Sequence, residues 1–147
     1  MTAKTDLQHM QRALTLARSQ AGRTGKNPSV GCVIIDATGI KISEGATGDG
    51  GADHAEALAL QTLKEGAARG GTAFVTLEPC RERSAGGKSC SELLLASGVS
   101  RVVCAIADAH PNGSGGFDRL RNAGLDVDVG LMEAEATEMY ADFFDEI

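Results

Sequence analysis

The chain has 147 residues, with 42% hydrophobic and 23% charged side chains and a formal net charge of −6, which fits one ordinary globular domain over residues 1–147. No apolar run approaches the ~20 residues of a membrane span, and residues 1–14 lack the apolar stretch of a secretory signal, so we expect a cytoplasmic protein without a membrane partner. The acidic balance and the lack of a long Lys/Arg cluster argue against nucleic acid as a partner.

The first half of the chain predicts a helix, a β-hairpin and a second helix. Apolar residues recur at helical spacing between Thr5 and Gln20. Two strand-like stretches, 30–36 and 40–47, are joined by a short turn and predict a hairpin. Asp53 is a plausible N-cap for a helix from His54 to about Ala68.

The second half alternates strands and helices. Ser89 and Glu92 fit the capping box of a short helix that Gly98 ends. A hairpin followed by this alternation predicts a mixed central sheet covered by helices on both faces, a three-layer α/β/α fold. The predicted elements are a strand at 72–77, a helix at 89–98, a strand at 101–107, a helix around Leu120, a strand at 125–130 and a helix at 133–144.

Three separated pieces of the sequence carry the chemistry of a metal site. His54 and Glu56 start a predicted helix, Cys80 follows a predicted strand, and Cys90 starts another helix. Catalytic zinc takes three protein ligands, from imidazole and thiolate among others, and keeps one position for water. The positive end of a helix favours a thiolate over a thiol. We therefore predict that His54, Cys80 and Cys90 hold Zn²⁺.

Glu56 lies two residues from the histidine, where its carboxylate can reach the water without binding the metal. Deamination needs such a group, because the amine leaves only after it is protonated. Zinc deaminases carry H-x-E followed by P-C-x-x-C, whereas nine residues separate Cys80 and Cys90 here. Glu56 can also be read as a first-turn helix carboxylate without a catalytic role.

Cys32 and Cys104 lie in apolar strands and are expected to be buried and inert.

From about Met10 to Met139 the chain resembles the deaminase domain of the bifunctional bacterial riboflavin-biosynthesis enzymes. The likeness is carried most specifically by KNPSVGCVI (26–34) and GTAFVTLEPC (71–80). It implies the cytidine deaminase-like fold, zinc on His54, Cys80 and Cys90, and Glu56 as the proton shuttle. It also implies deamination of diaminohydroxyphosphoribosylaminopyrimidine, a phosphorylated aminopyrimidine, with Asn27 on the ribose side of the substrate.

The loop after Cys80 departs from the family pattern, as does 108–120. Glu82 stands where the family typically has a histidine, and the loop is one residue longer. We expect Arg81, Arg83 and Lys88 either to clamp a substrate phosphate or to be solvated. The family usually continues into a reductase domain beyond the point where this chain stops, so that domain is expected to be absent.

Two other functions stay open on the sequence alone. One is a deaminase of another small base or nucleoside, of the cytosine or guanine type. The other is a non-catalytic zinc-binding protein of the same fold, although a structural site uses a fourth ligand and needs no general base. Three aromatic side chains in the last eight residues, Tyr140, Phe143 and Phe144, predict a homodimer or higher homo-oligomer.

Overall fold

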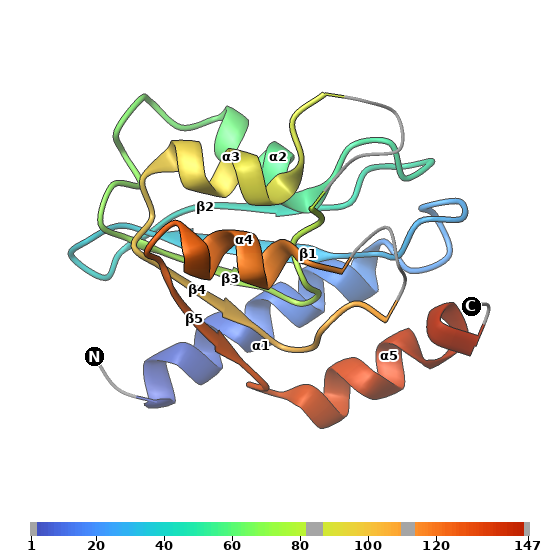
Figure 1. The fold of residues 1–147 in the computed structure, drawn as a ribbon. Helices are drawn as coiled ribbons and strands as arrows, with labels where there is room; N and C mark the ends of the chain where they lie inside the picture. Colours follow the sequence, from blue (N-terminus) through green and yellow to red (C-terminus); the bar gives the residue numbers. More distant parts are fainter. Residues whose placement is uncertain (1–2, 82–86, 110–113, 146–147) are drawn as a thin grey trace.

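The computed structural model describes residues 3–81, 87–109 and 114–145. Helices and strands follow one another in the order expected for an α/β protein (Figure 1). The elements are α1 (Ala3–Ser19), β1 (Gly31–Ile35), β2 (Lys41–Ala46), α2 (Ala55–Gln61), β3 (Thr72–Val75), α3 (Cys90–Ser97), β4 (Arg101–Cys104), α4 (Gly116–Asn122), β5 (Asp126–Val129) and α5 (Glu133–Asp145).

The strands form one mixed sheet in the order β2-β1-β3-β4-β5. The hairpin strand β1 is antiparallel to both β2 and β3, whereas β3, β4 and β5 run parallel to one another. Parallel strands need a crossover connection, which the intervening helices α3 and α4 provide. The predicted mixed sheet is therefore confirmed.

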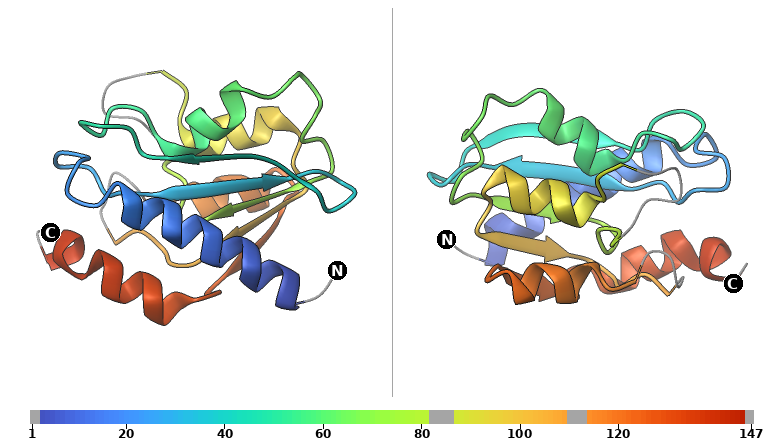
Figure 2. Two further views of the ribbon diagram at one scale, coloured as in Figure 1. Left: turned by 180° about the vertical axis from the view of Figure 1, so that it is seen from behind. Right: turned by 45° about the horizontal axis from the view of Figure 1, so that its top comes forward.

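Helices cover both faces of the sheet, which gives three layers (Figures 1 and 2). One core lies under α2, α3 and α4 and includes Ile34, Val75 and Leu94. The other core lies under α1 and α5 and includes Val33 and Phe74. Because neighbouring residues of one strand point to opposite faces, the apolar strand β1 can fill both cores at once. The structure thus has the predicted α/β/α architecture.

The capping box of α3 is confirmed, but the predicted start and length of α2 are wrong. Ser89 Oγ accepts the Glu92 N–H at 3.2 Å, and the Glu92 carboxylate accepts the Ser89 N–H at 3.2 Å. The N-cap of α2 is His54 rather than Asp53. The helix ends at Gln61 instead of near Ala68, because Gly66 has a positive φ of 81° and the residues around it are exposed, so the segment buries no continuous face.

The C-terminal aromatic residues pack against the α1 face of the sheet. Tyr140 is buried, and Phe143 and Phe144 are half-buried against the same core. The Tyr140 hydroxyl donates to the Ser29 carbonyl at 2.7 Å and contacts the Thr76 hydroxyl at 2.7 Å. Much of this apolar surface is therefore covered within the chain.

In the part of the chain that the structure describes, none of the helices is long and apolar enough to cross a bilayer.

Candidate metal centre

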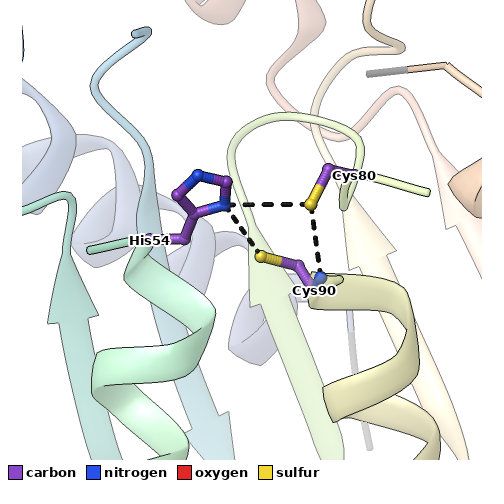
Figure 3. A group of neighbouring side chains, drawn as sticks. All are labelled: His54, Cys80 and Cys90. Carbon is purple, nitrogen blue, oxygen red and sulfur yellow. Dashed lines mark hydrogen bonds between the residues drawn. The ribbon is translucent and has the colours of Figure 1, made fainter. Parts of the chain in front are cut away.

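The centre is built where two helix N-termini meet the end of a central strand. His54 is the N-cap of α2, Cys90 is the first residue of α3, and Cys80 lies in the segment that follows β3. Their three side chains point toward one another (Figure 3). Both helices lie on one face of the sheet, which is why residues far apart in the sequence converge here.

The distances among the three side chains suit a small ion. His54 Nδ1 lies 3.2 Å from Cys90 Sγ and 3.8 Å from Cys80 Sγ. All three potential ligand atoms lie within 4.8 Å of one another. A tetrahedral zinc ion with its usual bond lengths separates a ligand nitrogen from a ligand sulfur by about 3.6 Å. One imidazole and two thiols at these separations therefore fit the three protein ligands of an open zinc site.

The local backbone also stabilises negative charge on Cys80. The N–H of Cys90, which has no partner within its own helix, donates to Cys80 Sγ at 3.2 Å. Hydrogen bonding from the Cys90 side chain, from His54 and from this N–H lowers the pKa of Cys80 to about 4. Hydrogen bonding to Cys80, together with burial, raises the pKa of Cys90. The fold thus stabilises the thiolate form of Cys80, which is the form that binds a metal.

Glu56 lies in the first turn of α2 and is buried, with only 3% of its surface exposed. Its carboxyl is within hydrogen-bonding reach of the Cys90 side chain. Loss of solvation raises the pKa of Glu56 to about 7, and the negative charge of Cys80 adds to the rise. A carboxyl group with this pKa can both accept and donate a proton near neutral pH.

Of the residues predicted to contact substrate, Asn27, Arg81 and Lys88 lie in the described part of the chain and are exposed. Asn27 is exposed, and its side-chain amide donates to the carbonyl of Gly51 at 2.7 Å, three residues before His54. Arg81 and Lys88 are exposed beside the two cysteines. Arg83 lies outside the described residues.

Cys32 and Cys104 are buried in the strands, as predicted. Burial raises the pKa of both thiols well above the ordinary value, which keeps them protonated.

The feature that the sequence analysis missed is Glu78, a buried carboxylate two residues before Cys80. A charged residue directly after an apolar strand was the available signal.

Comparison with known proteins gives a family match over most of the chain. A family model described as the cytidine and deoxycytidylate deaminase zinc-binding region matches residues 3–106. The riboflavin biosynthesis protein RibD of Aquifex aeolicus is 42% identical over 98% of this chain, and that of Escherichia coli K12 is 43% identical over 94%. The chain spans only 40% and 37% of these two relatives.

Another curated relative is as short as this chain. The diaminohydroxyphosphoribosylamino-pyrimidine deaminase of Buchnera aphidicola subsp. Acyrthosiphon pisum is 39% identical, and the match covers 95% of this chain and 93% of that protein. Among solved structures, the bifunctional deaminase/reductase of Thermotoga maritima superposes with a TM-score of 0.90 at 31% identity, over 98% of this chain and 41% of that one. The Aspergillus oryzae Rib2 deaminase, at 19% identity and a TM-score of 0.66, shares the fold.

Proposed function

Because the chain belongs to the cytidine and deoxycytidylate deaminase zinc-binding family, among the riboflavin-biosynthesis pyrimidine deaminases, we propose that it removes ammonia from an aminopyrimidine by zinc-dependent hydrolysis. The observation that carries the proposal is the buried Glu56 beside the convergent His54, Cys80 and Cys90. A purely structural zinc site uses four protein ligands and has no use for a buried carboxyl group next to them.

In this proposal His54, Cys80 and Cys90 hold the zinc ion. Bound in such a site, zinc lowers the pKa of a water molecule toward ~7 and so supplies the nucleophile at neutral pH. Two features of the chain serve this binding. The Cys90 N–H stabilises the Cys80 thiolate, and His54 and Cys90 are held at the starts of helices α2 and α3.

Glu56 moves the protons. Its carboxylate accepts a proton from the attacking water and delivers one to the amino nitrogen, which then leaves as ammonia. A pKa of about 7 suits both halves of this task, because the group changes protonation state without a large free-energy difference in either direction. Burial among the helices α2 and α3 is what raises that pKa.

For the substrate we propose diaminohydroxyphosphoribosylaminopyrimidine, the compound named for the Buchnera deaminases that match this chain over nearly their whole length. A 5′-phosphate on that compound suits the exposed cations beside the centre, Arg81 and Lys88, together with Arg83. Asn27 is proposed to contact the ribose side. The natural partner is then a small pyrimidine nucleotide, while self-association and a cytoplasmic location remain predictions.

An ammonia-release assay tests the function directly. The zinc-loaded protein is incubated with a panel of aminopyrimidines, with and without 5′-phosphate, and with cytosine, guanine and cytidine. Turnover of the phosphorylated aminopyrimidine supports the proposal. Turnover of only an unphosphorylated base or nucleoside favours a deaminase of another specificity, and no turnover in a preparation with one zinc per chain favours a non-catalytic member of the fold.

A further inference from the structure

Glu78 makes an unusual set of contacts for a buried acidic residue. It lies between β3 and Cys80, is 7% exposed, and its own N–H donates to the Ile106 carbonyl at 3.0 Å. Its carboxylate accepts three backbone N–H groups. Oε1 accepts from Asp108 at 3.0 Å, and Oε2 accepts from Gly115 at 3.1 Å and from Phe117 at 3.2 Å.

The donors lie at the two ends of the connection between β4 and α4, with Phe117 in the first turn of α4. Asp108 lies on its first flank, and Gly115 and Phe117 lie on its second, where Gly115 is the N-cap of α4. A single carboxylate therefore fixes both flanks of the connection relative to each other. A buried carboxylate is stable when N–H donors surround it, so these contacts account for the otherwise unfavourable charge.

The second flank is packed directly against the backbone around Cys80. A Cβ atom added at Gly116 would lie 1.7 Å from the Pro79 carbonyl oxygen, so only glycine allows this approach. A Cβ atom at Gly115 would lie 2.9 Å from Cδ of Arg81, which shows that the Arg81 side chain rests on this glycine. Glu78, which holds Gly115, thus fixes the backbone against which the Arg81 side chain packs.

We propose that Glu78 is a positioning residue for the reaction: by tying Asp108 to the start of α4, which packs against Pro79 and Arg81, it sets this wall of the substrate site. This inference rests on the proposed function, because only that function makes the site a substrate site. The contacts of Glu78 do not depend on it. Glu78 contacts neither the reacting atoms nor the predicted ligand atoms in this arrangement, so it acts through Gly115 and Arg81 on substrate binding.

Glu78→Gln should break one of the three hydrogen bonds and keep the other two. A glutamine has one carbonyl oxygen, and placing it at the Oε2 position keeps the Gly115 and Phe117 bonds. Its NH₂ group then faces the Asp108 N–H, where no hydrogen bond can form. We expect the Asp108 amide hydrogen to exchange on the order of tenfold faster by NMR, with smaller changes at Gly115 and Phe117. Glu78→Ala should release all three.

The kinetic test separates positioning from general destabilisation. We expect Glu78→Gln to keep its zinc and to raise KM for the phosphorylated aminopyrimidine on the order of tenfold, with a smaller change in kcat, because a neutral amide oxygen holds Gly115, and with it the backbone against which Arg81 packs, less firmly than the carboxylate does. The matched control is Asp6→Asn. Asp6 is an equally buried carboxylate, 8% exposed, that holds Arg101 at 2.6 Å and joins α1 to β4. Its loss should lower stability and leave KM unchanged.

Two results would overturn the proposal. One is unchanged exchange at Asp108 in Glu78→Gln, which would mean that the carboxylate does not hold this flank. The other is a wild-type KM in Glu78→Gln with faster exchange, which would mean that the held segment has no part in substrate binding. If the wild-type protein turns over no aminopyrimidine at all, the proposed function fails, while the exchange data still decide whether Glu78 holds the connection. If Glu78→Ala does not fold, Glu78→Gln carries the test.

Discussion

His54 Nδ1 lies 3.2 Å from Cys90 Sγ although 36 positions separate the two residues in the chain. The contact joins the N-cap of α2 to the first residue of α3 (Figure 3). Each side chain therefore depends on the packing of its helix against the same face of the sheet. A ligand pair held by two packed helices loses little conformational freedom when a metal binds, which favours tight binding.

The metal prediction is that the purified protein holds one zinc ion per chain through His54, Cys80 and Cys90. Cys90→Ala should lower zinc affinity by more than about 100-fold, beyond the effect of losing an outer partner of a ligand. Metal analysis after dialysis against a chelator measures this. The control is Cys104→Ala, a buried thiol in β4, which should lower stability by about 1 kcal/mol and keep the zinc. Equal zinc retention in both variants would contradict the assignment.

The catalytic prediction concerns Glu56. Glu56→Gln keeps the size and hydrogen-bonding shape of the side chain but cannot carry a proton between water and amine. We expect zinc and fold to be retained and kcat to fall by about 100-fold or more. The control is Glu92→Gln, the helix-capping carboxylate of α3, which should lower stability without a comparable loss of kcat. Near wild-type turnover in Glu56→Gln would remove the proton-shuttle role.

Features that depend on neighbours in sequence could be predicted, and features that depend on distant contacts could not. The capping box of Ser89 and Glu92 is local, and the pattern found it. The choice of His54 over Asp53 as the N-cap of α2 follows from packing that brings the His54 ring to the cysteines. The role of Glu78 is the clearest case, because its three N–H partners lie 30 to 39 positions away.

A pH prediction follows from the contact between α1 and β2. The Arg12 guanidinium donates to the Glu44 carboxylate at 2.6 and 3.0 Å, and Lys41 donates to it at 2.7 Å. These contacts, led by Arg12, lower the pKa of Glu44 to about 2. Because the pKa is lowered on folding, the stabilisation is complete above the unfolded pKa of about 4.5 and is lost as the pH falls toward 2.

Glu44→Gln should therefore be less stable than the wild type at pH 7, and the difference should shrink to about half or less at pH 3. Urea unfolding at the two pH values measures the difference, and Glu65→Gln, an exposed carboxylate in the turn after α2, is the control. A difference that is the same at both pH values would mean that the glutamine changes packing rather than the ion pair.

The last prediction concerns how the protein selects a phosphorylated substrate. Arg81 follows Cys80 directly, its side-chain carbons pack against Gly115, and the residue is exposed. Guanidinium groups bind phosphate oxygens through two parallel hydrogen bonds. Lys88, two residues before Cys90, can add charge but not this paired geometry. Arg81 should therefore matter more than Lys88.

We expect the wild-type protein to prefer the phosphorylated aminopyrimidine over its dephosphorylated form in kcat/KM. Arg81→Ala should reduce that preference by about ten- to a hundredfold, which corresponds to the loss of one charge-assisted hydrogen bond. Arg83→Ala and Lys88→Ala test the other two predicted phosphate contacts. Arg69→Ala is the control, because this exposed arginine precedes β3, at the opposite end of that strand from Cys80. A wild-type protein indifferent to the phosphate would count against the riboflavin-pathway substrate, since that compound carries one. A preference that survives all three substitutions would instead place the phosphate against other residues and leave the substrate assignment standing.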